Sequence, residues 1–507
     1  MFSDRQRPHL LVISLILIIV MLASAIHVSA ETVEVVYGPT KTSTGGNEEL
    51  PQIVIDHNGN IHIVWTNTTY LLYEMFNPSG NLLIGETVLN PCLSPYSWHV
   101  RRPSVVVDSN NNLHIVFHGF SHYSDFTDGV YQSSTSLSAS EVIYLKINPY
   151  LDDRDGSPAD PGVITVIPEK IISTNDSVKS RAPNIAIDRF DRLHVVWFDG
   201  DIWSAAGEVH YLVMDTDGNT LISETTLASG FYTDVDWSEP ELVVDSNGNA
   251  HVFFVTEGWT RDTYNWRDVW YLMVSGSDGS VLIAPTQLTE SGGTCRLTRP
   301  AIAIGDDDLI HVVYQNSTDE GFTELFLLRV NPYLDDHDGS PADPSVIVVS
   351  GPIQLTETDG YRSYLHNIAL DHWHREHVVW VDQRDFAPSP NWGSGELYYM
   401  IVGTINETRL TFFEGNIYPA YWWYSSGRRP GIAVSNDRVY LVFNGYDRDS
   451  YTSDIYFMIL RVPVPAPPIV GGMLQLEQPN ILAQASMLLV ATLTITAAAI
   501  ILARRRS

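Results

Sequence analysis

The chain contains 507 residues, of which 60 are acidic and 29 are lysine or arginine, giving a formal net charge of −31 at pH 7. A surface this acidic repels the phosphates of nucleic acids, so a nucleic-acid partner is excluded. Solvation of an exported surface is the simplest role for the charge. Length alone suggests about three domains, but the chain consists largely of internal repeats, which favour one large ring.

The first thirty residues have the features of a secretory signal peptide. An apolar run over residues 10–25 follows Arg5 and Arg7, and small side chains precede Glu31. This arrangement predicts a signal peptide over residues 1–30 and an exported mature chain that begins near Glu31. An uncleaved membrane anchor is the alternative.

Residues 31–462 contain seven copies of one pattern, in which a short apolar strand and a polar turn precede a second strand that usually starts with histidine and ends on an aromatic residue. The copies are PQIVIDHNGNIHIVW from Pro51, PSVVVDSNNNLHIVF from Pro103, PNIAIDRFDRLHVVW from Pro183, PELVVDSNGNAHVFF from Pro240, PAIAIGDDDLIHVVY from Pro300, HNIALDHWHREHVVW from His366 and PGIAVSNDRVYLVF from Pro430. Paired strands repeated at a period of roughly 50 to 80 residues predict a β-propeller.

Each copy continues with the elements of a complete blade. A third strand often opens on an acid, and these acids are Glu141, Glu208, Glu324, Glu396 and Asp454. A fourth strand often follows a tight glycine turn, such as the one at Gly218. Four antiparallel strands per copy correspond to one propeller blade.

The ends of the repeat region predict how the ring closes. The seventh copy stops after its third strand at Arg461, whereas an additional strand, Thr32 to Tyr37, precedes the first copy. Completion of the last blade by this N-terminal strand would leave no open sheet edge. We therefore predict an all-β fold, a seven-bladed β-propeller closed by its N-terminal strand, with eight or six blades as the alternatives.

A second apolar segment lies near the C-terminus. Residues 481–502 would form a helix of about 33 Å, which is enough to cross a hydrocarbon core of about 30 Å. The arginines of the tail, residues 503–507, predict a cytoplasmic location by the positive-inside rule, and the proline-rich stretch 463–480 predicts a short stalk. The propeller is then expected outside the cell membrane, held by a single transmembrane helix.

Cys92 and Cys295 are the two cysteines of the chain. Two cysteines make a sparse disulfide framework for an exported protein of this length. Either they pair with each other or both are free and buried.

A long duplication lies inside the repeat. Residues 148–161 recur almost letter for letter as residues 331–344, and the same offset relates Asp199 to Asp382. This predicts that a block of several blades was copied whole, with blades two to four giving blades five to seven.

The duplicated segments are the best metal candidates in the sequence. They place carboxylates at short spacing around a glycine turn, which suits the oxygen ligands of Ca²⁺. The distal glutamate of an EF-hand loop is missing, and an aspartate-rich turn without an ion is the alternative. The expected ion is structural, no other cofactor is expected, and the candidate ligands are Asp152, Asp153, Asp155, Asp160, Asp335, Asp336, Asp338 and Asp343.

The order Pro-x-Ile-Ala-Ile-Asp, turn, His-Val-Val-Trp resembles NHL-type repeats and also the BNR-type repeats of sialidase-like propellers. The resemblance covers residues 32–461 and implies the fold. Sialidases carry an Asp box of the type Ser-x-Asp-x-Gly-x-Thr-Trp, which the turn at Ser277 does not match. The resemblance therefore carries the fold and not automatically the chemistry.

Strand order predicts that the long second-to-third connections and the links between blades share one face, which we take as the functional face. Arginines gather on this face before the innermost strands, where guanidinium groups directed into one funnel would grip a ligand carboxylate. Similarity to sialidases, whose arginines bind the sugar carboxylate, implies the same role. The alternative is that each arginine pairs with an acid of a neighbouring blade. The arginines are Arg102, Arg181, Arg299, Arg362 and Arg429.

Tryptophans concentrate in the same connections. Exposed indole rings suit stacking on sugars or anchoring a protein partner, and packing between blades is the alternative. The candidates are Trp98, Trp259, Trp392, Trp422 and Trp423.

Two further sets of residues recur with the blades. Acids on the rim, including Asp199 and Asp382, are candidates for the carboxyl pair of a glycosidase, but their matching places in the duplication favour a structural role. The second-strand histidines recur once per blade, so they cannot converge on one ion, and we predict that they pack and form hydrogen bonds. They are His62, His114, His194, His251, His311 and His377.

These observations favour a membrane-anchored cell-surface propeller that binds a glycan or a protein ligand through its loop-rich face. One alternative is a sialidase-like glycoside hydrolase. The second alternative is a structural protein of the cell envelope. No residue is assigned a catalytic role.

Overall fold

A computed structural model describes most of the repeat region, which forms one unit over Thr32–Pro463. The predicted signal peptide, most of the stalk, the predicted membrane helix and both cysteines fall outside the described residues. Within them, no helix has the length and apolar character needed to span a bilayer. The structure describes residues 32–46, 48–67, 69–89, 98–121, 140–174, 176, 178–200, 207–231, 239–256, 268–290, 300–317, 322–385, 395–412, 417–419, 429–447 and 452–465.

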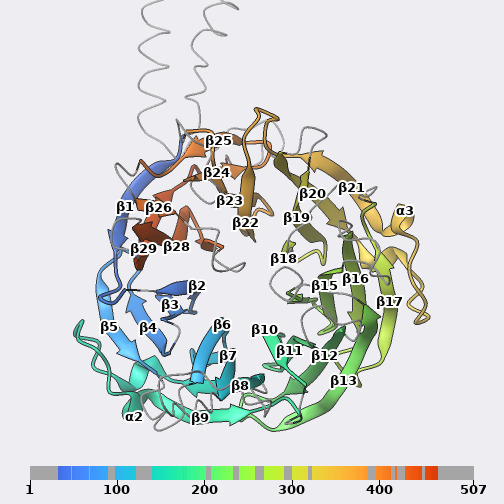
Figure 1. Cartoon of the computed structure of the whole chain (residues 1–507), viewed down its shortest axis with the longest axis horizontal. Helices are drawn as coiled ribbons and strands as arrows, with labels where there is room; N and C mark the ends of the chain where they lie inside the picture. The colour runs from blue at the N-terminus through green and yellow to red at the C-terminus, as the bar shows by residue number, and fades with distance from the viewer. Residues whose placement is uncertain are drawn as a thin grey trace, which may run out of the picture. The chain divides into compact units, whose positions relative to one another are not determined.

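The strands form seven sheets that follow one another around a ring (Figure 1). In the first six sheets, four antiparallel strands pair in chain order, and the first strand lies nearest the axis. Blade 1 consists of β2 (Glu49–Ile55), β3 (Ile61–Thr66), β4 (Leu71–Phe76) and β5 (Leu82–Val88). Blade 2 consists of β6 (Trp98–Val107), β7 (Leu113–Ser121), β8 (Ser140–Ile147) and β9 (Thr165–Ile171). Blade 3 consists of β10 (Ser180–Ile187), β11 (Leu193–Asp199), β12 (Gly207–Met214) and β13 (Thr220–Phe231).

Blades 4 to 6 repeat this plan. Blade 4 consists of β14 (Glu241–Val244), β15 (Ala250–Thr256), β16 (Asp268–Val274) and β17 (Val281–Gln287). Blade 5 consists of β18 (Ala301–Ile304), β19 (Ile310–Ser317), β20 (Thr323–Val330) and β21 (Val348–Gln354). Blade 6 consists of β22 (Ser363–Leu370), β23 (Glu376–Asp382), β24 (Glu396–Ile401) and β25 (Ile405–Arg409). The prediction of four antiparallel strands per blade is confirmed.

Blade 7 combines the two ends of the propeller. Its strands are β26 (Ile417–Pro419), β27 (Gly431–Ser435), β28 (Arg438–Asp447) and β29 (Thr452–Arg461), and β1 (Glu34–Lys41) pairs antiparallel with β29. Glu34 lies opposite Arg461 and Lys41 opposite Tyr456. The predicted seven blades and their closure by the N-terminal strand are confirmed, although this strand extends to Lys41 instead of ending at Tyr37.

Burial on both faces explains why the second strands are continuous apolar runs. Every residue of β11 is buried, whereas the outer strand β13 is mostly part-exposed or exposed. A cluster of buried apolar side chains fills each junction between neighbouring blades, and Trp65, Trp197 and Trp380 are fully buried near the ends of their strands. Burial of this apolar surface is the main force that holds the blades together.

The conserved spacing of the repeat builds a buried hydrogen-bond relay inside most blades. In blade 3, Nδ1 of His194 lies 2.7 Å from the Tyr211 hydroxyl, and Nε2 lies 3.3 Å from the Asp188 carboxylate. The same Asp-His-Tyr contacts occur at His62, His114, His251 and His377. The predicted packing and hydrogen-bonding role of these histidines is confirmed.

Blade 5 departs from the relay. Gly305 stands where blades 1 to 4 and blade 6 have the aspartate, and Nδ1 of His311 instead lies 2.6 Å from the Glu376 carboxylate of blade 6. Arg329 donates two hydrogen bonds to the same Glu376 carboxylate, at 2.6 and 2.8 Å. The lost contact within the blade is thus replaced by one between blades.

The duplicated segments between the third and fourth strands fasten neighbouring blades together. The first contains η1 (Pro149–Leu151) and α2 (Pro161–Ile164), and the second contains η2 (Pro332–Leu334) and α3 (Pro344–Ile347). Tyr150 donates to Asp56 of blade 1 and Tyr333 donates to Asp245 of blade 4. We call these segments the blade 1–2 clamp (residues 148–164) and the blade 4–5 clamp (residues 331–347).

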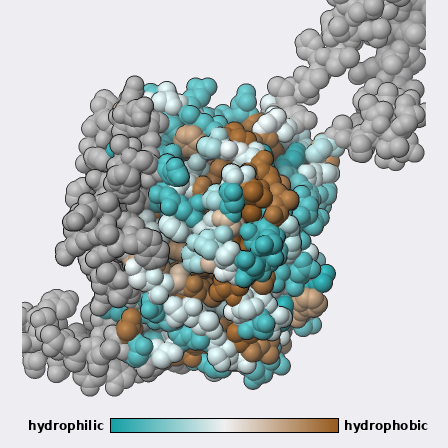
Figure 2. Space-filling view, turned by 90° about the vertical axis from the view of Figure 1, so that its right-hand side faces the viewer, coloured by the Kyte–Doolittle hydropathy of each residue, from teal (hydrophilic) through white to brown (hydrophobic). Residues whose placement is uncertain are grey.

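The side of the ring that carries β17, β21 and α3 has a mixed surface. Figure 2 shows hydrophobic patches there among hydrophilic residues. The exposed apolar side chains of α3 and β21 include Val346, Val349 and Ile353. Counterparts in the first clamp and its strand, Val163 and Val166, are exposed to a similar degree.

Candidate functional site

A polar pocket lies where the innermost strands of the first blades begin. It is lined by Leu50, Gln52, Arg102, Pro103, Ser104, Ala182, Pro183, Asn184 and Glu239. The residue after the first proline of each strand faces this pocket in blades 1 to 3, and it supplies an amide, a hydroxyl and a second amide. Such groups donate and accept hydrogen bonds with neutral polar ligands.

Backbone bulges shape the rim of this pocket. Leu50, Arg102 and Ala182 have φ angles of 57°, 56° and 50°. At each of these positions the pairing between the first and second strands of the blade shifts in register. A non-glycine residue rarely adopts this left-handed conformation, and its recurrence in three blades marks a designed bend in the strand. The bulge separates the residue that precedes the proline from the regular part of the strand.

Two buried ion pairs cross between blades close to the pocket. Arg102 of blade 2 pairs with Glu239, which precedes β14 of blade 4 and is only 2 % exposed. Nη1 of Arg429, which precedes β27 of blade 7, lies 3.2 Å from Oε1 of Glu241 in β14 and donates to the Pro300 carbonyl at 3.0 Å. Blade 4 therefore provides the acids that hold arginines from two other blades.

Burial dominates the electrostatics of this arrangement. It raises the pKa of Glu241 to about 7, although Arg429 and a hydrogen bond from Asn184 act in the opposite direction. Burial also lowers the pKa of Arg429 to about 10, with Glu241 opposing the shift. At neutral pH the Glu241 carboxyl group is therefore only partly ionised, whereas Arg429 keeps its charge.

The predicted arginines thus have different environments. Arg102 of blade 2 and Arg429 of blade 7 contact acids of blade 4, which adjoins neither blade, so these ion pairs reach across the ring instead of joining neighbouring blades. Arg181 is buried at the start of β10, and Arg362 lies directly before β22, where its carbonyl accepts from the Gln383 amide at 3.2 Å. Arg299 lies outside the described residues.

The predicted aromatic platform lies largely beyond the described ranges. Trp259, Trp392, Trp422 and Trp423 fall outside them, and Trp98 begins β6 with its side chain not described. A role of these tryptophans in ligand binding stays a prediction.

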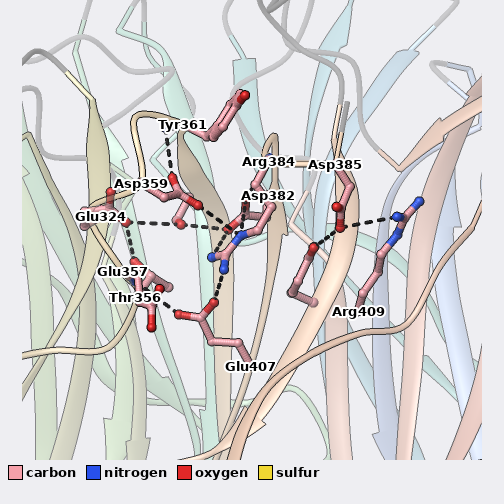
Figure 3. Close-up of polar contacts among 12 residues, drawn as sticks. Glu324, Thr356, Glu357, Asp359, Tyr361, Asp382, Arg384, Asp385, Glu407 and Arg409 are labelled. Atoms are coloured by element: carbon pink, nitrogen blue, oxygen red, sulfur yellow. Dashed lines mark hydrogen bonds and ion pairs between the residues drawn. The ribbon is translucent and has the colours of Figure 1, made fainter. Parts of the chain in front are cut away.

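A second polar site joins blades 5 and 6, and Figure 3 shows Arg384 between three carboxylates there. Arg384 donates to both oxygens of Asp382 at 3.0 and 2.8 Å, pairs with Glu407, and lies 3.4 Å from Asp359. Asp382 also accepts hydrogen bonds from Trp380 and Ser363, each at 3.0 Å. The guanidinium group therefore pairs with one buried acid, Asp382, and with two acids that are more exposed, Glu407 and Asp359.

The acid that opens the third strand belongs to the same site. Glu324 is fully buried and accepts a hydrogen bond of 2.6 Å from Thr356, whose hydroxyl in turn accepts from the Leu325 amide at 3.0 Å. Burial raises the pKa of Glu324 to about 7. We call the set Glu324, Thr356, Asp382, Arg384 and Glu407 the blade 5–6 seam.

The duplicated counterpart joins blades 2 and 3. Glu141 accepts from Ser173 at 2.6 Å, and Glu224 accepts from the amide and hydroxyl of Thr174 at 2.8 and 2.5 Å. His210 lies 2.6 Å from Glu224 through Nδ1 and 2.9 Å from Glu208 through Nε2. The blade 2–3 seam, defined as Glu141, Ser173, Asp199, His210 and Glu224, has no arginine among its members.

The electrostatics of the blade 2–3 seam reflect an excess of acids. The pKa of Asp199 is raised to about 6, mainly by burial and also by the nearby acids Asp176, Glu224 and Glu208, while His210 acts in the opposite direction. Burial alone would lower the pKa of His210, but hydrogen bonds with Glu224 and Glu208 raise it. The pKa values of Asp199 and His210 are thus both raised, because several acids lie close together around one imidazole.

Most of the predicted calcium ligands have local roles in the clamps. Asp152 and Asp155 accept from the amides of Arg154 and Ser157 at 2.8 and 2.9 Å, and Asp160 caps α2. Asp335, Asp338 and Asp343 repeat these contacts in the second clamp, where Asp336 is exposed like Asp153 in the first. Among the described residues, the set of three metal-ligating side chains with mutually close ligand atoms is Asp199, His210 and Glu224.

Sequence reasoning did not single out several residues that the structure places at these sites. Glu239, Glu241 and Asn184 emerge from the start of the inner strands, and His210 and Glu224 from the outer half of blade 3. A position-by-position comparison of the repeats gives a signal for two of them. Asn184 and Glu241 both follow the proline that opens the inner strand, where the last two copies have Asn367 and Gly431.

Solved structures of other proteins resemble this chain in fold. The chain is similar to a polysaccharide lyase of the PL25 ulvan lyase family bound to the saccharide GlcA(1-4)Rha3S, with 10 % identity, a TM-score of 0.50, and coverage of 82 % of this chain and 95 % of that one. An arabinanase from Penicillium chrysogenum in complex with arabinobiose matches with 12 % identity, a TM-score of 0.41, and coverage of 71 % and 93 %. At such identities the likeness shows the fold alone. No family model and no curated protein matches the sequence.

Proposed function

We propose that this protein binds a polysaccharide at the polar pocket formed by the inner strands of blades 1 to 4. The observation that carries the proposal is the composition of the pocket, in which Gln52, Ser104 and Asn184 lie beside the Arg102–Glu239 ion pair. Amides, hydroxyls and paired charges fixed by a rigid scaffold are the groups that bind sugar hydroxyls with defined orientation.

The fold comparison supports the same class of ligand. The ulvan lyase structure contains a saccharide, and its fold resembles that of this chain. Since the arginines near the pocket pair with acids, we propose that the ligand is recognised mainly through hydroxyl groups. A sugar carboxylate would have to displace Glu239 from Arg102 to gain a bidentate contact.

A glycan array tests the proposal. The soluble fragment 31–463 retains Val462 and Pro463, because the Val462 amide donates to Asp437 at 2.8 Å and Arg375 donates to the Pro463 carbonyl at 2.7 Å. Binding to polysaccharides is expected, and Gln52→Ala should weaken it by about fivefold, the equivalent of one hydrogen bond. The control Gln354→Ala alters an exposed amide on β21 and should leave binding unchanged. A flat array would contradict the proposal and favour a structural role.

We further propose that the propeller is exported and tethered to the cell membrane by residues 481–502. The apolar length of this segment and the arginines that follow it support a single span with the propeller outside. In intact cells, added protease should degrade the propeller, and removal of residues 481–507 should release it into the medium. Retention of the truncated protein in the cytoplasm would contradict this topology.

A structural Ca²⁺ ion in the duplicated clamps also stays a proposal. Its support is the spacing of eight aspartates around two glycine turns. Addition of a chelator should then lower the melting temperature, and Asp155→Asn together with Asp338→Asn should abolish that difference. An unchanged melting temperature would contradict it.

A further inference from the structure

The two duplicated seams solve the same electrostatic problem differently. In the blade 5–6 seam, the guanidinium group of Arg384 lies among Asp359, Asp382 and Glu407. The offset of the duplication matches these acids with Asp176, Asp199 and Glu224, so the carboxylates were retained. The residue that corresponds to Arg384 is Asp201, which lies outside the described residues and adds no positive charge to the sequence at that position.

Asp199 shows the consequence of this difference. Asp382 accepts hydrogen bonds from Trp380, Ser363 and Arg384, whereas Oδ1 of Asp199 is buried and accepts none from any residue that the structure describes. The residue is only 6 % exposed. Leaving a buried carboxylate oxygen without a donor is costly, so this atom points to a missing partner.

The Asp199 carboxylate is directed toward two further ligands. One carboxylate oxygen of Asp199, one ring nitrogen of His210 and one carboxylate oxygen of Glu224 all lie within 4.8 Å of one another. Counterparts of the groups that hold Asp382, namely Ser180 Oγ and Nε1 of Trp197, donate to no described residue. The Asp199 carboxylate therefore lacks the strand donors that hold Asp382 in the duplicated seam.

We propose that Asp199, His210 and Glu224 bind a divalent transition-metal ion, of which Zn²⁺ is the best match. One imidazole and two carboxylates form a mixed nitrogen and oxygen set that suits Zn²⁺ better than Ca²⁺ or Mg²⁺, which prefer oxygen ligands alone. Three protein ligands leave a fourth position open. The ion takes the place that the Arg384 guanidinium fills in the duplicated seam.

The surroundings of the three ligands match those of a metal site. His210 contacts Glu224 through Nδ1 and Glu208 through Nε2, so one nitrogen can bind the ion while the other donates to Glu208. A carboxylate that orients the second nitrogen is the usual outer partner of a metal-bound histidine. Thr174 fixes Glu224 from the other side with two hydrogen bonds. The distance of 2.6 Å between Nδ1 and Oε1 must lengthen toward about 3.3 Å, the ligand spacing of tetrahedral zinc.

Metal binding to the full chain tests the proposal. Protein treated with EDTA and then dialysed is titrated with ZnCl₂ by calorimetry, and its melting temperature is measured in parallel. One ion per chain and a higher melting temperature are expected. The absence of a zinc-dependent change in both measurements would overturn the proposal and leave a protonated His210 as the cation of the seam.

Variants locate the ion. Asp199→Asn should lower the zinc affinity by about 100-fold or more, because it removes a charged ligand. His210→Tyr copies Tyr398, which packs on Trp380 at 5.7 Å as His210 packs on Trp197, so the fold is retained while the nitrogen ligand is lost. The matched control Asp382→Asn alters the duplicated seam and should leave the zinc affinity unchanged. Equal zinc binding by the wild type, Asp199→Asn and His210→Tyr would overturn the assignment.

A calcium titration separates this site from the clamps. If CaCl₂ stabilises the protein and Asp199→Asn does not alter the effect, the calcium belongs elsewhere, and the seam assignment then depends on zinc alone. If Asp199→Asn abolishes a calcium effect and zinc has none, the choice of a transition metal is wrong. The proposed polysaccharide pocket does not include these residues, so failure of one proposal leaves the other standing.

Discussion

The blade 2–3 and blade 5–6 seams occupy matching positions of the duplicated sequence, yet only the second has an arginine among its acids in the part of the chain that the structure describes. Both retain the buried glutamate of the third strand with its hydroxyl donor, and both retain the glutamate of the fourth strand. They differ in the group placed among the acids, Arg384 in one and His210 in the other. Duplication has preserved the scaffold of acids and changed the positive partner, which is where a new binding property can arise.

Removal of the resident cation should have the largest effect. Arg384→Met leaves the buried Asp382 and the part-buried Glu407 without their counter-charge, and we expect the free energy of unfolding to fall by about 3 kcal/mol. Urea denaturation monitored by tryptophan fluorescence measures the change. Arg461→Met is the control, since its ion pair with Glu34 is exposed and should contribute less than about 1 kcal/mol. A similar small change in both variants would contradict a stabilising role for Arg384.

Removal of the tyrosine hydroxyl group should destabilise the two clamps equally, because both clamps form the same contact with the neighbouring blade. Tyr150→Phe removes the hydroxyl that contacts Asp56, Asn58 and Asn60, and Tyr333→Phe removes its equivalent at Asp245. Each should lower the free energy of unfolding by about 1 to 2 kcal/mol, since a hydrogen bond to a charged group is lost. The double variant should show the sum, because the sites lie on separate blades. Unequal single effects would show that the clamps have diverged.

The pH dependence of stability should reveal the buried acids of both seams. Burial raises the pKa of Glu141 and Glu324 to about 7 and that of Asp199 to about 6. An acid whose pKa is higher in the folded state favours folding when protonated, so the contribution of these acids to stability should fall as the pH rises from about 4 toward 7. The melting temperature of EDTA-treated protein measures this decline, and Asp199→Asn should reduce it.

The opposite sign applies to the relays. Although burial alone raises the pKa of Asp56 and Asp371, hydrogen bonds from His62 and His377 lower it below the ordinary value. These carboxylates stabilise the fold above a pH of about 4, and the contribution is lost as the pH falls further. Burial also lowers the pKa of His62, His114 and His377, so their neutral forms add stability as the pH rises through about 6.5. The difference in melting temperature between the wild type and Asp199→Asn isolates the seam from the relays, and a difference that stays constant from pH 4 to 7 would contradict the contribution expected of Asp199.

An exchange of the residues that cap the fourth-strand glutamates should have the smallest effect. Thr174 donates to Glu224 through its amide and hydroxyl, whereas its counterpart Glu357 donates to Glu407 through the amide alone. Thr174→Glu should lower the free energy of unfolding by about 0.5 to 1 kcal/mol, because it removes a hydrogen bond and adds a like charge. Glu357→Thr should shift it in the opposite direction. If Thr174→Glu and Glu357→Thr changed the free energy of unfolding in the same direction, the contact would not play the same role in the two seams.

The sequence predicts the ring because the relevant forces are local and repeated. Apolar second strands, glycine turns and the extra N-terminal strand each depend on neighbours a few residues away or on one pairing at the ends. The histidine relay was predictable for the same reason, since Asp188 and His194 occur at fixed spacing. The regular repeat therefore predicts the architecture of the ring, but it does not locate a functional site.

The ion pairs near the axis were less accessible to sequence reasoning. Whether Arg429 grips a ligand or contacts Glu241 depends on which blades oppose each other and on rotamers, and no spacing encodes that. The blade 2–3 seam was also missed, because His210 lies two residues from Glu208 in a strand whose alternation predicts only packing. What exposed it was a comparison of Asp199 with its copy Asp382 in three dimensions.

The closure of the ring also determines how the protein would respond to mechanical load. The chain leaves the propeller through β29, which pairs with β28 on one side and β1 on the other, so it is an interior strand of its sheet. A pull applied at Pro463 must break hydrogen bonds on both edges before the blade opens, starting where Arg461 lies opposite Glu34 and Arg438. For a protein held at that end while its opposite region grips a large polymer, such anchorage would resist unravelling under flow.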